Sequence, residues 1–188
     1  TSEVVRVTGR DPAGLRDGIV RIVNLMGLRQ APFLEKREQV YRPRLTVRLG
    51  AVPWMGSFRD LVFMGFNAVL LPEAQFHALS LSDAIPELAV RRELDLLKRM
   101  HDASEEAAKY GLKTYCWVSS QRKFPKDDPV LVKNPEIRGA LTWKEDGEYI
   151  LCTEHPLVRR YYRETVEGIF RSIPGLSGLV MFSGGEVF

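Results

Sequence analysis

The sequence predicts an α/β fold, the first half of a (β/α)8 (TIM) barrel preceded by the end of a small α/β domain. From residue 45 onwards, short apolar segments alternate with amphipathic ones, which is typical of parallel strands joined by helices. The pattern also allows an open doubly wound sheet, but residues 49–54 lack the Gly-x-Gly-x-x-Gly turn of a dinucleotide site. A complete barrel takes about 250 residues, so we expect this chain to stop half-way round, with four strands and the three helices between them.

The composition is that of an ordinary globular protein, with 188 residues, 45% of them hydrophobic, and a net charge of +3. Basic and acidic residues are interspersed, which argues against a nucleic-acid partner. Cys116 and Cys152 are too few for a disulfide framework and have no zinc-ligand spacing to the histidines, so we expect free thiols and neither a metal nor a cofactor. No apolar segment is long enough to cross a bilayer and no secretory leader is visible, so we expect a soluble protein of bacterial type, cytoplasmic or secreted, without a membrane partner.

Residues 1–40 are interpreted as the C-terminal part of a small α/β domain and its linker. The valines of residues 4–7 predict a short strand, and Asp11-Pro12 predicts a helix start. That helix should end at Gly27, and its apolar face should comprise Leu15, Ile19, Ile22, Val23 and Met26. One strand and one helix cannot enclose a core, so we expect the earlier part of this domain to lie outside the chain.

Residues 41–188 are interpreted as the N-terminal half of the barrel. The predicted strands are residues 45–49, 66–71, 112–118 and 179–182. The predicted helices are residues 58–64, a long helix from Pro86 to Gly111, and a helix from His155-Pro156 to Ile173. Residues 121–147 form a long excursion after the third strand, and a loop of that length is typically functional or flexible.

Polar residues follow the strands at the edge where such sheets bind ligands. Ser183-Gly-Gly-Glu186 comes directly after the fourth strand, and Trp117 and Ser119 end the third. Ligands bind outside the carboxyl ends of parallel strands, so Glu186 is placed for chemistry, and the two glycines permit a sharp turn. The alternative is that Glu186 is a solvated residue after a common turn.

Three motifs in this order resemble glycoside hydrolases of the group containing family 20 β-hexosaminidases and family 67 α-glucuronidases. They are Pro43-Arg-Leu-Thr-Val-Arg48, Cys152-Thr-Glu-His-Pro156 with its tyrosine-rich helix, and Gly184-Gly-Glu186. The helix at Asp11-Pro12 resembles the last helix of the small domain that precedes the barrel in both families. Family 20 enzymes have Gly-Gly-Asp-Glu, and the aspartate is missing here. The resemblance therefore points to an α-glucuronidase-like relative or a distinct branch, with a β-N-acetylhexosaminidase-like hydrolase as an alternative.

The resemblance implies a glycosidase that cleaves glycosidic bonds in carbohydrate, with Glu186 as general acid and Arg48 as a sugar ligand. Trp54 and Trp117 would stack on a sugar face, Glu73 would accept hydroxyl hydrogen bonds, and Ser119 completes the expected contacts. Each has a structural alternative: a carboxylate partner for Arg48, core positions for the tryptophans and a loop ion pair for Glu73.

The resemblance places the second catalytic group on later strands, in the remainder of the barrel, which would come from the same protein or another chain. We therefore expect this chain alone to be inactive. The sugar, the linkage and the stereochemical course stay open. A non-catalytic carbohydrate-binding α/β module is the alternative from another class.

Overall fold

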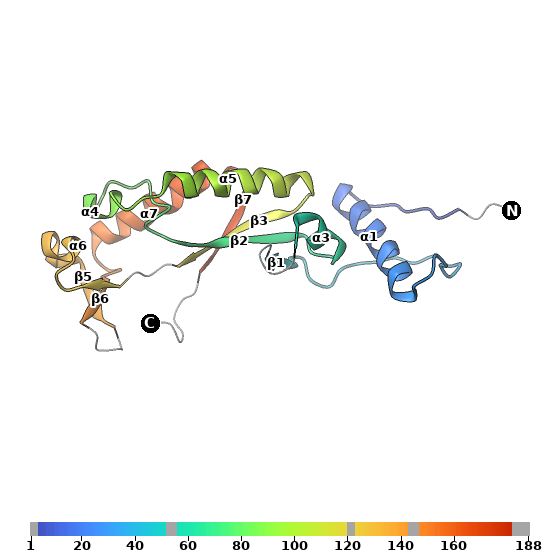
Figure 1. The fold of residues 1–188 in the computed structure, drawn as a ribbon, viewed down its shortest axis with the longest axis horizontal. Coiled ribbons are helices and arrows are strands. Elements are labelled where there is room, and N and C mark those ends of the chain that lie inside the picture. Colours follow the sequence, from blue (N-terminus) through green and yellow to red (C-terminus); the bar gives the residue numbers. More distant parts are fainter. Residues whose placement is uncertain (1–3, 52–55, 120–122, 143–146, 182–188) are drawn as a thin grey trace.

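The computed structural model describes residues 4–51, 56–119, 123–142 and 147–181 (Figure 1). The described part contains helices, a four-stranded parallel sheet and a three-stranded antiparallel sheet. The α/β class predicted from the sequence is thereby confirmed. None of the described helices is long and apolar enough to span a membrane.

The parallel sheet follows the order of the chain. Its strands are β1 (Leu49–Ala51), β2 (Ala68–Gln75), β3 (Lys113–Ser119) and β7 (Leu176–Met181). They pair in the order β1-β2-β3-β7, every neighbouring pair is parallel, and the order does not reverse among these described strands. The predicted strand at residues 45–49 is wrong except for its last residue, whereas β2 continues four residues beyond its predicted end.

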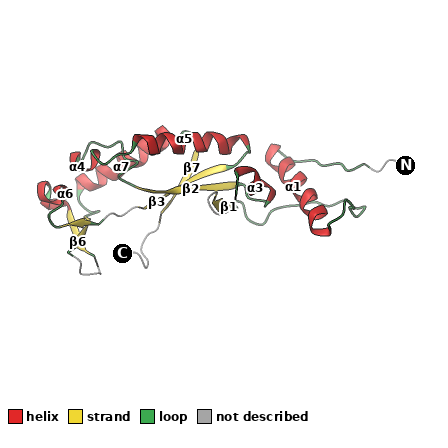
Figure 2. Cartoon of the chain, in the orientation of Figure 1, coloured by secondary structure: helices red, strands yellow, loops and turns green. Residues whose placement is uncertain are grey.

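Helices cover one face of this sheet. They are α3 (Phe58–Phe63), α5 (Leu94–Lys109) and α7 (Pro156–Ser172). The short helix α4 (Pro86–Ala89) lies in the connection between β2 and α5. α5 and α7 run side by side along the same face of the strands (Figures 1 and 2). The main core between them and the sheet includes Leu71, Cys116, Val118, Met100, Leu97, Tyr161, Ile169 and Ile173. The predicted short helix at residues 58–64 and the predicted helix start at His155-Pro156 are confirmed.

The predicted single helix from Pro86 to Gly111 is wrong, because the chain leaves the helical path between α4 and α5. Val90 and Leu94, which would share its buried face, are 83% and 61% exposed. The backbone N–H of Glu93 instead donates to the carbonyl of Ala78 at 2.7 Å. The neighbouring Arg91 and Arg92 turn towards the carboxylates of Asp128 and Asp83. Tertiary hydrogen bonds and ion pairs therefore override the helical spacing at this point.

A compact unit, which we call the β4–β6 module (residues 123–142 and 147–151), replaces the loop expected after β3. It contains β4 (Phe124–Pro125), α6 (Pro129–Lys133), a 3-10 turn η1 (Pro135–Ile137), β5 (Arg138–Leu141) and β6 (Glu148–Leu151). The strands are antiparallel in the order β4-β6-β5. Phe124, Val130, Leu131, Ile137 and Leu151 extend the main core into the module. This part of the excursion is therefore folded and packed.

Helix α1 (Pro12–Arg29) lies at the other end of the molecule from the β4–β6 module (Figure 1). The Asp11 carboxylate accepts from the N–H of Gly14 at 2.7 Å, which confirms the predicted start. The helix passes the predicted stop at Gly27 and ends at Arg29, and its C-cap is Gln30, whose φ is +52°. Val20 packs with Leu61, Val62, Val69, Ala107 and Leu112 in a second, smaller core.

The N-terminal segment departs from its prediction in two respects. Residues 4–9 are described but form no strand. On the predicted apolar face of α1, Leu15, Ile19 and Val23 are 40%, 47% and 43% exposed. The helix is therefore fixed to the rest of the described chain through Val20 and through the polar contacts described below.

Candidate functional site

A β-bulge interrupts β2 near the carboxyl edge of the parallel sheet. Leu71 pairs with Cys116 and Ala74 with Val118, so Pro72 and Glu73 together oppose the single residue Trp117. Proline has no N–H for the ladder and is tolerated inside a sheet at such bulges. The bulge thus explains how β2 continues past a residue that would otherwise end it. Bulges are also frequent beside active sites, where they redirect a side chain.

The bulge places Glu73 and Trp117 on neighbouring strands, on the face of the sheet that points away from the helices. Leu71 and Ala74 are 2% and 4% exposed and belong to the core on the helix side. The bulge interrupts the alternation of side chains, so Pro72 and Glu73, which together oppose Trp117, both face away from the helices, and both are exposed. Trp117 lies between buried Cys116 and Val118 and is half-buried. Both Glu73 and Trp117 make further contacts within the protein.

The next strand ends at the same edge. Trp117 pairs with Val180, and Val118 pairs with Met181, the last residue of β7. Glu186 follows Met181 by five positions in the sequence. Glu186 and Trp54 lie outside the described residues. Ser119 is the final residue of β3 and pairs with Gln75, and its side chain is likewise outside the described part.

A buried polar network holds the segment after β2 against α7. The hydroxyls of Ser80 and Thr165 lie 2.6 Å apart, and the N–H of Ser82 donates to Ser80 at 3.1 Å. The Ser82 hydroxyl donates to Glu164 at 2.6 Å, and this bond together with Arg160 lowers the pKa of the Glu164 carboxyl. The connection leaving the carboxyl edge is therefore fixed in place. The sequence analysis missed this network, because its partners are more than 80 residues apart.

Ion pairs fix the β4–β6 module beside this edge. Arg91 donates to both carboxylate oxygens of Asp128, at 2.8 and 3.0 Å. Asp128 also accepts from the N–H of Val130 and so caps α6. Glu87 binds Asn134 at 3.1 Å and Lys133 at 3.2 Å. Hydrogen bonds from its own backbone N–H and from these two side chains lower the pKa of Glu87.

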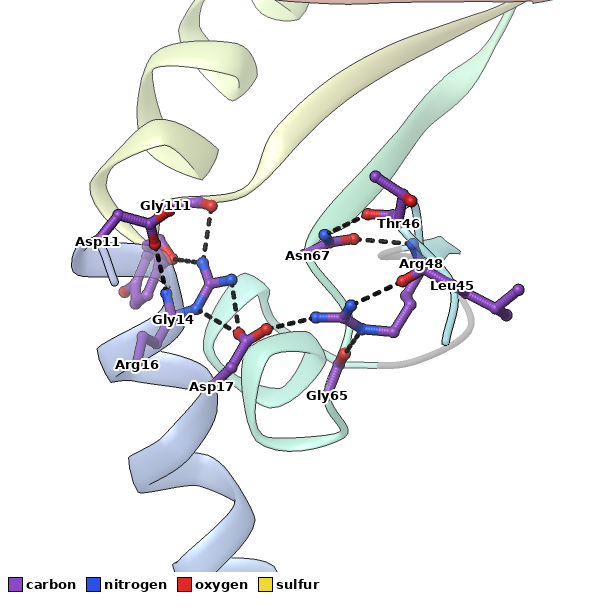
Figure 3. Close-up of polar contacts among 11 residues, drawn as sticks. Asp11, Gly14, Arg16, Asp17, Leu45, Thr46, Arg48, Gly65, Asn67 and Gly111 are labelled. Carbon is purple, nitrogen blue, oxygen red and sulfur yellow. Dashed lines mark hydrogen bonds and ion pairs between the residues drawn. The ribbon is translucent and has the colours of Figure 1, made fainter. Parts of the chain in front are cut away.

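Arg48 lies at the opposite, amino end of the sheet (Figure 3). Its Nε donates to the carbonyl of Gly65 at 2.6 Å and its Nη1 to that of Leu45 at 3.0 Å. Its Nη2 lies 2.7 Å from Oδ2 of Asp17 on α1. These contacts correspond to the structural alternative, an arginine paired with a carboxylate. The backbone N–H of Asn67 donates to the carbonyl of Arg48, and Asn67 precedes Glu73 by six residues, or roughly 20 Å of strand, so Arg48 and Glu73 lie at opposite ends of the sheet.

The Asp17 carboxylate joins two guanidinium groups. Arg16 donates to it from Nη2 at 2.9 Å and reaches the carbonyls of Gly111 and Tyr110 through Nη1, at 2.7 and 3.1 Å. The Asn67 side chain accepts from the N–H of Arg48 and donates to the carbonyl of Thr46. We call Arg16, Asp17, Arg48 and Asn67 the amino-end cluster. It ties α1 to the starts of β1, β2 and β3.

Among the described residues, the two cysteines are free, and no group of three or more histidine, cysteine or acidic side chains is placed to hold a metal ion. Burial raises the pKa of the Cys116 thiol to about 12, so it is neutral at physiological pH. Its Sγ lies 3.7 Å from Sδ of Met100 in the core. Among the described residues at the carboxyl edge, Glu73 and Trp117 are the side chains that the sequence analysis proposed for a site.

No protein-family model, curated protein or solved structure matches this chain.

Proposed function

We propose that residues 41–188 supply the first four strands of a (β/α)8-barrel glycoside hydrolase that binds a saccharide at the carboxyl ends of β2, β3 and β7. Connections between parallel strands are right-handed, so all helices lie on one face of the sheet only if each new strand is added on the same side of the previous one. In a doubly wound sheet the strand order reverses, and helices cover both faces. The order β1-β2-β3-β7, with α5 and α7 on one face, supports the barrel. In such a barrel Leu70, Tyr115, Trp117 and Val180, all half-buried, would face the interior.

The observation on which the function rests is the pairing at the carboxyl edge. The bulge places Glu73 opposite Trp117 in the register of β2 and β3. Strand β7 pairs with Trp117 through Val180, and Glu186 follows Val180 by six residues in the sequence. A ring that stacks a sugar and a carboxylate that accepts hydroxyl hydrogen bonds are common elements of saccharide sites. Arg48 has no place in this site, because the amino-end cluster holds it at the other end of the sheet.

Glu186 is proposed as the general acid. Glycoside hydrolysis needs a proton for the departing oxygen and a second group for the oxocarbenium-like centre. The second group would come from later strands, as would partners for β1 and β7, the edge strands of the described parallel sheet. The lack of an aspartate before Glu186 favours an α-glucuronidase-like enzyme over a β-N-acetylhexosaminidase-like one, because no group at that position would orient an acetamido substituent.

The test is Glu186→Gln in the full-length protein that contains the chain, assayed on p-nitrophenyl glucuronides and N-acetylglucosaminides of both anomers. Loss of a general acid lowers turnover by roughly 10²- to 10⁴-fold, and we expect sugar binding to persist. Glu105→Gln is the matched control, since Glu105 is exposed on α5. Unchanged turnover in Glu186→Gln would reject the assignment.

A non-catalytic carbohydrate-binding module is the second candidate. It is favoured by the position of Glu73 opposite Trp117, because these two residues could bind a sugar whether or not a general acid is present. A wild-type protein that binds oligosaccharides but hydrolyses none of these glycosides would establish this alternative.

A further inference from the structure

We propose that the hydroxyl of Tyr115 binds a hydroxyl group of the saccharide and forms part of the floor of its site. The inference rests on the proposed function, because it takes the open face of the parallel sheet to become the interior of a barrel that binds a sugar. It adds a binding residue that neither the motifs nor the strand ends indicate.

Tyr115 lies on the face of the parallel sheet that points away from the helices. It stands between Thr114 and Cys116, which are 1% and 0% exposed on the helix side, and it is itself half-buried. Tyr115 pairs with Gly178 on β7. Gly178 precedes Met181, the last residue of β7, by three residues, or roughly 10 Å of strand. The ring therefore lies below the carboxyl edge, where the floor of a site would be.

Gly178 provides the space that the ring of Tyr115 occupies. A Cβ atom at this position would lie 2.9 Å from Cε1 and 3.0 Å from Cδ1 of the ring, which is closer than side chains normally approach. Glycine inside a strand often marks such a close approach. The side chain of Tyr115 therefore extends across β7, along the face that the proposed barrel would enclose.

The hydroxyl of Tyr115 is available to a ligand. It forms no hydrogen bond with any residue that the structure describes, and it remains accessible to solvent. Its neighbours on this face, Leu70 on β2 and Val180 on β7, have apolar side chains. Phenylalanine would fill the space over Gly178 equally well, so the described packing does not account for the hydroxyl.

The chemistry of a phenol suits a sugar hydroxyl as its partner. A phenol that becomes enclosed needs a hydrogen bond, because burying an unpaired hydroxyl is costly. Phenol and sugar hydroxyls both donate and accept, so the two can pair in either direction. A bound sugar would thus satisfy Tyr115 once later strands close over this face. A side chain on those later strands is the alternative partner, and the experiment distinguishes the two.

The experiment measures saccharide binding by the full-length protein that contains the chain and by its Tyr115→Phe variant. The ligands are p-nitrophenyl thioglycosides of glucose, glucuronic acid and N-acetylglucosamine, whose sulfur linkage resists hydrolysis. The tightest-binding one is then compared with its monodeoxy analogues, each of which lacks one sugar hydroxyl. Tyr110→Phe is the matched control, because Tyr110 is 38% exposed and caps α5 at the amino end of the sheet.

We expect Tyr115→Phe to raise the Kd of the tightest-binding thioglycoside about 3- to 10-fold, the effect of one neutral hydrogen bond. One monodeoxy analogue should bind the wild type and the variant equally, because it lacks the hydroxyl that Tyr115 binds. Gly178→Ala keeps the phenol but places a methyl group where its ring lies, so it should give the same pattern. Tyr110→Phe should leave every Kd unchanged.

The proposal is overturned if no thioglycoside binds the wild-type protein, if Tyr115→Phe binds as tightly as the wild type, or if its Kd rises by the same factor for every analogue. A lower Tm of Tyr115→Phe with unchanged Kd values would place the partner of the hydroxyl on the later strands and would also overturn it. The proposed hydrolase is tested separately by Glu186→Gln. Unchanged turnover in that variant, together with an analogue-specific loss in Tyr115→Phe, would remove the general acid and keep the Tyr115 contact.

Discussion

The carboxylate of Asp17 on α1 lies 2.7 Å from the guanidinium of Arg48, which precedes β1 (Figure 3). The same carboxylate lies 2.9 Å from Arg16, and the three side chains are only 18–19% exposed. Two partly buried cations thus share one anion. Removing one of these three side chains would leave a partly buried charge without its partner. The contact should therefore stabilise the packing of α1 against the parallel sheet.

Asp17→Asn is expected to lower the free energy of unfolding by about 1–3 kcal/mol, because the amide can accept hydrogen bonds but provides no charge for Arg16 and Arg48. Chemical denaturation measures the change. Glu35→Gln is the control: Glu35 pairs with Arg37 on the surface, with the two side chains 59% and 44% exposed, and an exposed pair contributes about 0–1 kcal/mol. Equal effects of the two substitutions would contradict the structural role of the amino-end cluster.

Arg48→Lys separates the structural role of Arg48 from a role in sugar binding. Lysine keeps the charge but cannot reach Asp17 and the carbonyls of Gly65 and Leu45 with one planar group. We expect a loss of about 1–2 kcal/mol in stability and no change in the Kd for an oligosaccharide. Weaker saccharide binding at unchanged stability would instead restore Arg48 as a sugar ligand.

Asp128→Ala should loosen the β4–β6 module. The substitution removes both the ion pair with Arg91 and the cap of α6, and we expect a cost of about 2–4 kcal/mol. Hydrogen exchange in residues 124–151 should increase more than exchange in α5. Asp127→Ala is the matched control one residue away, because Asp127 is exposed. If both variants exchange alike, the module is held mainly by its apolar core.

The sequence predicts the parts of the fold that depend on local periodicity. The apolar runs give β3, the first half of β2 and the second half of β7, and Asp-Pro or His-Pro pairs give the starts of α1 and α7. The same signal at Asp128-Pro129 marks α6, which was missed inside the excursion. The strands of the β4–β6 module have two to four residues. Such short strands show no periodicity, and the core that they share with α7 stabilises them.

Long-range contacts determine what the sequence could not predict. The strand prediction ended at Leu71 because Pro72 normally terminates a strand, and only pairing with β3 shows that a bulge accommodates it. The helix prediction ran through residues 90–93 because the partner of Arg91, Asp128, is 37 residues away. For the site, Glu73 and Trp117 could each be proposed from their positions at strand ends. Their adjacency follows from the register, which no local pattern specifies.

Cys116 should be unreactive in the folded chain, whereas Cys152 should react. Cys116 is fully buried and its thiol has a pKa of about 12, while Cys152 is half-exposed. The thiolate is the reactive form, so iodoacetamide at pH 8 should label Cys152 first and Cys116 only in denaturant. Mass spectrometry of the digested protein distinguishes the two sites, and Cys152→Ser should abolish the rapid phase. Rapid labelling of Cys116 in that variant would show that the core between β3 and α5 opens easily.

Tyr161→Phe should stabilise the protein slightly. The ring of Tyr161 is 2% exposed and packs against Phe76 and Tyr162, at centroid distances of 6.2 and 5.6 Å. Its hydroxyl is buried near the side chains of Ser80 and Thr165 but forms no hydrogen bond of good geometry among the described residues. Removing such a hydroxyl relieves a desolvation cost, so we expect a gain of about 1 kcal/mol at pH 7. Thr165→Val, which removes bonds to Ser80 and to the carbonyl of Tyr161, should instead destabilise.

The same substitution should also alter the response to alkali. Burial raises the pKa of Tyr161 from 10.0 to about 12, so the unfolded chain releases this proton at a lower pH than the folded chain. The contribution of Tyr161 to the free energy of unfolding is therefore fully present below pH 10 and is lost as the pH rises towards 12. Cys116 adds a loss from pH 9 towards 12 for the same reason, so Tyr161→Phe is best compared within a Cys116→Ala background. Urea denaturation between pH 8 and 11.5 should then show that the free energy of unfolding declines less steeply with pH in the phenylalanine variant. Parallel declines in the two proteins would mean that the Tyr161 hydroxyl ionises as readily in the folded state as in water.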